Sequence, residues 1–418
     1  MAGRPVSTAD LEHAFREEWS AVVATLARRL GDLQAAEDAT AEAFAAAARA
    51  WARDGVPPNP GGWLTVTAWR KAIDQRRRDR LVAMDTQMLD QVTAAGEEDP
   101  EMEAGRLVDD RLGLVFACCH PALALEVRVA MTLRYVAGLT TAEIAAAFLL
   151  PEPTLAQRLV RAKRKIREQG IRFEVPGPDS LAGRLHGVRA VVYLVFNEGY
   201  AATGGDRLVR GELCEEAIWL GRLLHRLLPA DAETAGLLAL MLLHHSRAAA
   251  RQDSDGRPVP LAGQDRSRWD RALIAEGTAV LDAAMARRAP GPYQLQAAII
   301  AVHVQAASFD DIDWPQIAAL YRELARWDPS PVIEVNRAVA VGMADGPRAG
   351  LAVLEPILTS GALAGYAPLH AAHADLLDRA GEKDAAAAAW ARAAAATSND
   401  ALREELHRRR GEASGEPN

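Results

Sequence analysis

Residues 138–167 read GLTTAEIAAAFLLPEPTLAQRLVRAKRKIR, and this stretch predicts two helices joined by a short turn. Thr140 and Glu143 form the Thr-x-x-Glu pattern that caps the start of a helix. Pro151 and Pro153 force a turn after that helix, and Pro153 suits the first position of a second one. The stretch is therefore a candidate helix-turn-helix, a motif that places its second helix in the major groove of DNA.

The second helix of this stretch has an apolar face and a basic face. The apolar residues recur at helical spacing and predict a buried stripe, made of Leu155, Leu159, Ala162 and Ile166. The opposite face can read guanine and adenine edges through its Arg and Gln donors. It contains Thr154, Gln157, Arg158, Arg161 and Lys165. Flanking cations suit phosphates, which position a helix without specifying sequence, and these are Lys163, Arg164 and Arg167.

Charge argues against an ordinary solvated helix here. Residues 153–172 contain seven Arg or Lys residues and one acid, Glu168, so the acidic partners that usually balance such a face are missing. The net charge of the whole chain is −8, yet residues 81–105 contain seven acids and no base, while residues 106–175 contain 11 bases and seven acids. Basic charge is thus concentrated in short stretches, as in proteins that bind nucleic acid.

Length and cysteine content limit the possible classes of protein. The chain has 418 residues, enough for two or three domains, and half of them are hydrophobic. Its three cysteines make no disulfide framework. We see no signal peptide and no apolar run of membrane length, so we expect a cytoplasmic protein with no membrane partner.

The N-terminal part predicts a bundle of helices. Apolar residues recur at helical spacing over residues 8–30, and an alanine-rich helix is expected over residues 33–52. The second helix carries Glu37, Asp38 and Glu42 in its N-terminal half. These acids suit either the helix dipole or a surface that binds a partner.

A third helix, over residues 63–78, begins aromatic and ends basic. Aromatic rings beside cations suit opened or single-stranded DNA, because bases stack on rings and phosphates meet cations. For Trp63 and Trp69 ordinary core packing is the alternative. The acidic residues 81–105 that follow have no clear period and predict a linker.

Together these features resemble a known family. Residues 10–170 resemble a bacterial RNA polymerase sigma factor of the extracytoplasmic-function type. AEDATAEAF at residues 36–44 is similar to the region that binds the coiled coil of the polymerase β′ subunit. Residues 60–78 resemble the region that melts and reads the minus-ten element, and residues 139–163 resemble the region that reads the minus-thirty-five element.

The resemblance implies partners and site residues. The partners would be core RNA polymerase, through its β′ and β subunits, and promoter DNA. The core-binding residues would be Glu37, Asp38, Glu42 and Phe44. The minus-ten residues would be Trp69, Arg70, Lys71, Asp74, Gln75, Arg77 and Arg78. The minus-thirty-five residues would be Thr154, Gln157, Arg158, Arg161, Lys163, Arg164 and Lys165.

The chain continues for about 240 residues beyond the recognition helix, and the continuation predicts helices throughout. It resembles the large C-terminal extension of one sigma subgroup, which is regarded as tetratricopeptide-like. Residues 366–399 predict a helix, a turn at Gly381 and a second helix over roughly the 34-residue tetratricopeptide period, with small residues such as Ala385 and Ala389 where the helices would meet. Stacked repeats leave a concave surface that typically binds peptide or protein, so a regulatory protein is a candidate partner.

The expected fold class is all-α: two small helical sigma domains, the second a helix-turn-helix, followed by a larger helical extension. The expected parts are residues 8–80, the acidic linker 81–105, residues 106–172 and residues 178–410. The expected function is promoter-specific transcription initiation, modulated by the extension. A stand-alone helix-turn-helix regulator with a tetratricopeptide sensing module is the alternative, and a scaffold that has lost DNA binding is a third interpretation.

Enzymatic activity is not expected, because the chain has no phosphate loop, nucleophile elbow or zinc hydrolase motif. Three groups could be imagined as metal ligands: Cys118-Cys119-His120, His244-His245 with Asp253, and His303 with Asp310, Asp311 and Asp313. Structural packing explains the cysteine segment more simply, since no second ligand pair lies at zinc spacing. Adjacent histidines on a helix point about 100° apart and rarely bind one ion together, and a polar turn explains the aspartates. We therefore expect no catalytic residues, no metal and no cofactor.

Overall fold

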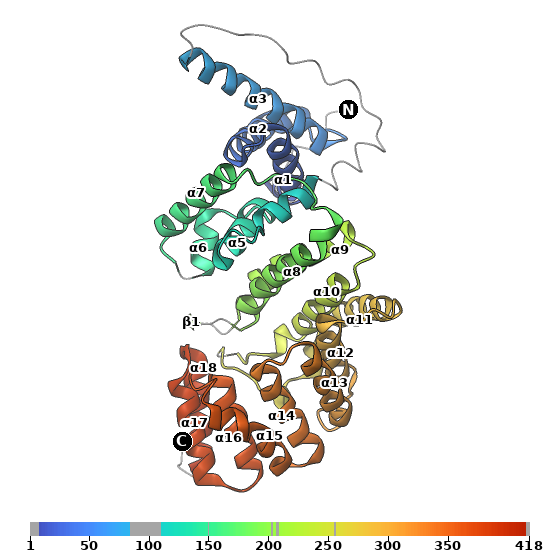
Figure 1. Cartoon of the computed structure of the whole chain (residues 1–418), viewed down its shortest axis with the longest axis vertical. Helices are drawn as coiled ribbons and strands as arrows, with labels where there is room; N and C mark the ends of the chain where they lie inside the picture. Colours follow the sequence, from blue (N-terminus) through green and yellow to red (C-terminus); the bar gives the residue numbers. More distant parts are fainter. Residues whose placement is uncertain are drawn as a thin grey trace. The chain divides into compact units, whose positions relative to one another are not determined.

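The structure is a computed structural model that describes residues 8–83, 110–148, 150–201, 204–205, 209–254 and 256–414. Most of the predicted linker, residues 84–105, lies outside these ranges. The predicted all-α class is confirmed, because the elements of the described residues are helices apart from one pair of two-residue strands (Figure 1). The chain forms two compact units that divide between Val192 and Tyr193.

The first unit begins with three packed helices: α1 (Thr8–Leu30), α2 (Leu33–Asp54) and α3 (Pro60–Ala83). α2 begins where Oδ1 of Asp32 accepts hydrogen bonds from the backbone N of Gln34 and Ala35, at 2.8 and 3.1 Å. α3 begins three residues earlier than predicted. Proline suits a first helical position, and the Asn59 side chain accepts a hydrogen bond from the backbone N of Gly62 at 2.9 Å.

A second group of helices follows in the same unit. It contains a helix over residues 110–118, α5 (Leu125–Met131), the π-helix η1 (Thr132–Val136), α6 (Thr141–Ala147) and α7 (Glu152–Glu168). The predicted helix-turn-helix is confirmed as α6 and α7. The capping box is present: the backbone N of Glu143 donates to Thr140 Oγ1 at 3.2 Å, and the Glu143 carboxylate accepts from the backbone N of Thr140 at 2.7 Å.

The predicted apolar stripe of α7 is also confirmed, since Leu155, Leu159, Ala162 and Ile166 are all buried. Pro153, however, takes the second position of the helix, because α7 begins at Glu152 directly after Pro151. The stripe faces α5 and α6, which contact α7. This packing fixes which side of α7 is left for solvent or a ligand.

The boundary between the units lies inside α8 (Pro178–Tyr200). Near its start, Arg184 donates to the backbone O of Phe116 in the first unit at 2.5 Å. The second unit contains α9 (Gly211–Leu227), α10 (Ala232–His245), η2 (Ala248–Ala250), η3 (Leu261–Gly263), η4 (Arg266–Arg268), α11 (Arg271–Met285) and α12 (Pro292–Gln305). It continues with α13 (Trp314–Trp327), α14 (Pro331–Asp345), α15 (Pro347–Ser360), α16 (Ala367–Arg379), α17 (Lys383–Ala395) and α18 (Asp400–Ser414).

Consecutive helices of the second unit contact one another as pairs, such as α14 with α15 and α16 with α17. The predicted turn at Gly381 is confirmed, and its φ of +81° explains why glycine stands there. Ala389 is buried as expected, but Ala385 is exposed and its neighbour Ala386 is buried instead. The strands β1 (Gly204–Gly205) and β2 (Ser398–Asn399) pair in parallel. Within the described ranges, no helix is both long and apolar enough to cross a membrane.

Candidate nucleic-acid interface

The basic face of α7 is open to solvent. Its exposed residues are Thr154, Gln157, Arg158, Arg161, Arg164 and Lys165. They lie opposite the buried stripe, so the helix can present them without disturbing the core. Two are tethered at the edges of the face, because Arg164 pairs with Glu168 at 3.4 Å and Lys165 donates to the backbone O of Ala122 at 2.6 Å. The face offers several donors that suit base edges and cations that suit phosphates.

Lys163 differs from the other predicted contacts on α7. Its side chain is only 14% exposed, and its Nζ lies 3.0 Å from the Glu37 carboxylate. It also lies over the ring of Tyr135, with Nζ 5.8 Å from the ring centroid. In this arrangement Lys163 therefore contacts α2, while its role in DNA binding stays a prediction.

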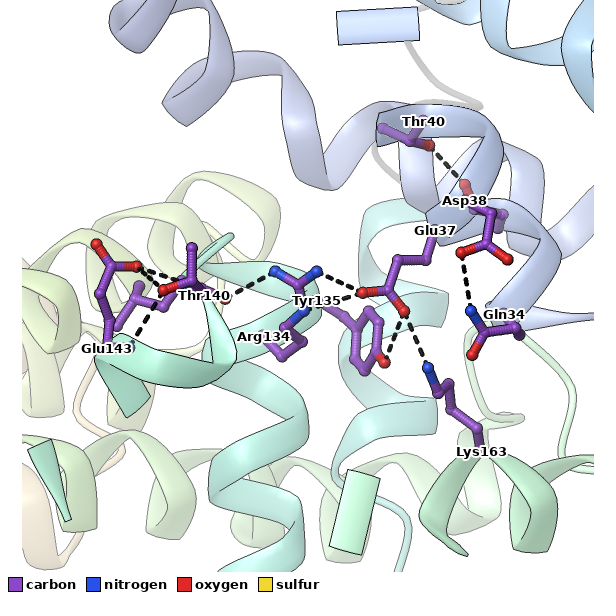
Figure 2. Close-up of polar contacts among 11 residues, drawn as sticks. Gln34, Glu37, Asp38, Thr40, Arg134, Tyr135, Thr140, Glu143 and Lys163 are labelled. Atoms are coloured by element: carbon purple, nitrogen blue, oxygen red, sulfur yellow. Dashed lines mark hydrogen bonds and ion pairs between the residues drawn. The ribbon is translucent and has the colours of Figure 1, made fainter. Parts of the chain in front are cut away.

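Glu37 is the centre of this contact between the two groups of helices (Figure 2). It is 8% exposed, and its Oε1 accepts from Arg134 Nε at 2.9 Å and from Arg134 Nη2 at 2.5 Å. Its Oε2 accepts from the hydroxyl of Tyr135 and from Lys163 Nζ, both at 3.0 Å. A buried carboxylate with this many donors is well satisfied, whereas removal of the carboxylate would leave Arg134 without its ion pair.

The electrostatics of Glu37 follow from its neighbours. Burial alone would raise the pKa of its carboxyl, but the charges and hydrogen bonds of Arg134 and Lys163 hold the pKa below its ordinary value. Burial and the nearby Glu37 carboxylate raise the pKa of Tyr135 well above its usual range. Glu37 is therefore ionised and Tyr135 is a neutral donor at neutral pH.

The four predicted core-binding residues separate into two pairs. Asp38 is exposed and accepts from the side chain of Gln34 at 2.8 Å, as Figure 2 shows. Glu42 is also exposed and forms an ion pair with Lys71 of α3 at 3.1 Å. Phe44 and Glu37 point inward instead. The ring of Phe44 lies 5.0 Å from that of Phe15. Asp38 and Glu42 are thus the acids that a protein partner could reach in this arrangement.

On α3, most of the predicted minus-ten residues are exposed. They are Arg70, Asp74, Gln75, Arg77 and Arg78. Trp69 is half-buried, and the guanidinium of Arg29 lies 5.6 Å from its ring centroid, so part of its surface remains available for stacking. Lys71 is held by Glu42 across the surface between α2 and α3.

Two residues that contact Glu37 are absent from the predicted sites: Arg134 and Tyr135. Both lie in η1, and they are 97 and 98 positions from Glu37 in the sequence. Arg134 also donates to the backbone O of Leu139, and its guanidinium lies 5.6 Å from the ring centroid of Trp19. The available signal was a polar Arg-Tyr pair inside the apolar residues 129–136, which indicates a buried polar contact without naming its partner.

The cysteine segment is part of the core. Cys118 and Cys119 are both buried, and burial raises the pKa of Cys119 to about 11, so its sulfur is a thiol at neutral pH. Across the described ranges, no group of three or more His, Cys, Asp or Glu side chains is arranged to hold a metal ion.

Comparison with known proteins identifies three segments. Residues 15–81 match the family described as Sigma-70 region 2, and residues 114–166 match Sigma-70, region 4. Residues 184–285 match a family of unknown function, DUF6596. The chain is also 43% identical over 377 residues to "Uncharacterized protein R00370" of Rhizobium meliloti (strain 1021), which covers 90% of this chain and 89% of that protein. No solved structure matches the chain significantly.

Proposed function

This chain belongs to the same family as the Rhizobium meliloti protein and carries Sigma-70 regions 2 and 4, and on that basis we propose that it is a sigma factor of the extracytoplasmic-function type. It would bind core RNA polymerase and direct transcription initiation at specific promoters. The observation that carries this proposal is the order of the two regions, with exposed basic faces on α3 and α7. A stand-alone repressor needs only the second of these faces.

Each surface has an assigned role in the proposal. The exposed acids Asp38 and Glu42 of α2 would bind the polymerase β′ subunit. The exposed end of α3 would bind opened minus-ten DNA through Trp69 and its arginines. The basic face of α7 would enter the major groove at the minus-thirty-five element, with Arg158 and Arg161 reading base edges.

Promoter geometry requires the two regions to separate. The two elements lie about 25 base pairs apart, which is roughly 85 Å at about 3.4 Å per base pair. Region 2 and region 4 contact each other here through the 3.0 Å ion pair of Glu37 and Lys163. One protein therefore cannot hold this contact and occupy both elements at once, so the arrangement with Glu37 paired is the closed form of the factor.

The C-terminal extension would modulate this activity. Residues 176–418 contain 25 bases and 31 acids, so the extension is acidic while α3 and α7 are basic. Its paired helices suit a tetratricopeptide-like surface for a regulatory protein. Transcription initiation would place the protein in the cytoplasm.

A binding experiment distinguishes this proposal from the stand-alone regulator. A labelled promoter duplex is titrated with the full chain, alone and with core polymerase, by electrophoretic mobility shift. A sigma factor requires the polymerase for sequence-specific binding, and Arg161→Ala should weaken that binding about tenfold. The matched control is Arg226→Ala, which changes an exposed arginine of α9 in the second unit, outside the surfaces of α2, α3 and α7. Tight specific binding of duplex by the chain alone would support the regulator instead.

A further inference from the structure

Three arginines with little or no ionic compensation gather in the second unit, all within the DUF6596 segment. Arg247 follows α10 and is only 7% exposed. Its Nη2 donates to the hydroxyl of Tyr200 at 2.8 Å. On the same tyrosine, the guanidinium of Arg251 lies 3.5 Å from the ring centroid. One tyrosine of α8 thus holds two guanidinium groups.

Arg266 joins the cluster through Trp269. Its guanidinium lies 4.3 Å from the ring centroid of Trp269, and that of Arg247 lies 6.0 Å from the same centroid. The Nη1 of Arg266 donates to the backbone O of His303 and of Ala306, at 2.9 and 2.8 Å. Trp269 is itself 3% exposed, so the indole connects two cations inside the unit.

The cluster has an excess of positive charge. In the described ranges, none of the three arginines forms a salt bridge. Arginine cannot lose its proton in a protein, and burial of an uncompensated charge is costly. The neighbouring histidines respond by staying neutral: burial, Arg247 and Arg266 lower the pKa of His303 to about 4, and burial followed by Arg247 and Arg251 lowers that of His244. Asp311 is the acid whose charge acts on Arg266, and it is exposed.

Three polar atoms of the arginines and of Trp269 have no partner, beside the unpartnered Nδ1 of the neighbouring His303. Arg247 Nε, Arg266 Nη2 and Trp269 Nε1 are buried and have no hydrogen-bond partner. All three can only donate. A group that only accepts, and that carries negative charge, would satisfy the donors and the charge together.

We infer that Arg247, Arg251 and Arg266 with Trp269 form a binding site for an oxyanion, the phosphate or carboxylate group of a small ligand. A cavity of about 310 Å³ adjoins the cluster at His303 and is lined further by Phe309, Trp314 and Tyr321. It has room for an apolar or aromatic body attached to the anionic group. The site lies in the second unit alone, so the inference does not depend on the sigma function.

Ordered water could satisfy the same three donors, but it would bring no charge. The two explanations differ in what a substitution does. Arg247→Met removes a buried charge and keeps much of the side-chain volume, so it should leave the free protein as stable or make it more stable. The same change should abolish stabilisation by an anion. If Arg247 served only to stabilise the fold, Arg247→Met would instead destabilise the free protein.

The test is thermal unfolding of the full chain in inorganic phosphate or acetate, with sodium chloride at equal ionic strength as reference. We expect a midpoint that rises and saturates with one of these oxyanions but not with chloride, and a response at least fivefold smaller in Arg247→Met. The matched control is Arg337→Met, since Arg337 already pairs with Glu334 at 2.6 Å in the same unit. Phosphate acting alone would indicate a phosphorylated ligand, and acetate acting alone a carboxylic acid.

Three results would overturn the site: no saturable response to either oxyanion, an equal response in Arg247→Met, or an equal loss in both variants. If Arg247→Met does not fold, Arg251→Lys answers the same question. It keeps a positive charge but removes the planar donors, and it should weaken the saturable response while Arg337→Lys does not. Isothermal titration of phosphate or acetate into the unsubstituted chain measures binding without any variant.

Discussion

Glu37 is the residue on which the proposed closed form depends. Its carboxylate accepts from Arg134, Tyr135 and Lys163, and it is almost fully buried. Removing one partner of such a buried ion pair is strongly destabilising, because the remaining charges lose their compensation. The contact between regions 2 and 4 should therefore respond to this side chain more than to any exposed acid of α2.

Glu37→Gln should shift the equilibrium away from the closed form by about 3 kcal/mol. The measurement is energy transfer between one dye on region 2 and one on region 4 of the full chain. We expect a marked fall in transfer for Glu37→Gln. Glu42→Gln is the control, because Glu42 pairs with Lys71 inside region 2 and should leave transfer unchanged. Equal energy transfer in both variants would show that Glu37 does not hold regions 2 and 4 together.

The same residue predicts how pH acts on the closed form. Because the closed form lowers the pKa of Glu37 below its ordinary value of 4.5, the stabilisation is fully present above that value. It is lost as pH falls below 4.5 and through the lowered pKa. Energy transfer should thus be constant from pH 7 to 5 and fall at lower pH, and Glu37→Gln should remove this dependence. A transition near pH 6.5 would point to a histidine instead.

At the scale of the element, the sequence predicted features set by neighbouring residues better than it predicted long-range contacts. The capping pattern of Thr140 and Glu143, the apolar stripe of α7 and the glycine at position 381 each predicted a feature that the structure confirms. Each depends on residues within a few positions of one another, so a single sequence contains the whole signal. Element ends were less accurate, as Pro60 and Pro153 show.

The features that the sequence did not predict are mostly contacts between residues far apart in the chain. Nothing near Glu37 indicates Arg134 or Lys163 as its partner, because the two pairs join residues 97 and 126 positions apart in the sequence. The π-helix η1, which brings Arg134 and Tyr135 to that carboxylate, has no local signature. The arginine cluster escaped prediction for the same reason, since Tyr200, Arg247 and Arg266 come from three separate segments.

Close helix packing gives a prediction for the α14 and α15 pair. A Cβ at position 350 would lie 2.6 Å from the backbone O of Ala338 and 2.9 Å from Cα of Gly342. Gly350→Ala should therefore lower the free energy of unfolding of the second unit by about 1–3 kcal/mol, as overpacking does. Urea unfolding followed by circular dichroism measures this.

The control for that substitution is a glycine with free space around it. Gly411 lies inside α18, and a Cβ there meets nothing within 4 Å. Gly411→Ala should raise the free energy of unfolding by about 0.5–1 kcal/mol, because alanine favours a helix over glycine. If Gly350→Ala stabilised the protein as much, α14 and α15 would not pack as closely as the structure has them.

At the scale of the whole molecule, the proposed function requires a change of arrangement. The contact at Glu37 and the separation of promoter elements by roughly 85 Å exclude each other. We expect high energy transfer between regions 2 and 4 in the free chain and almost none in a complex with core polymerase and promoter DNA. Transfer that stays high in a complex active in transcription would show that the contact is no barrier to promoter binding.

The central claim is that this chain gives RNA polymerase its choice of promoter. The most direct measurement is transcription by purified core polymerase on a library of promoter fragments, with and without the full chain. The account predicts new transcripts that begin at defined positions and that decrease strongly with Arg161→Ala but not with Arg226→Ala. No new transcript and no binding to core polymerase, with tight specific binding of duplex DNA by the chain alone, would contradict it.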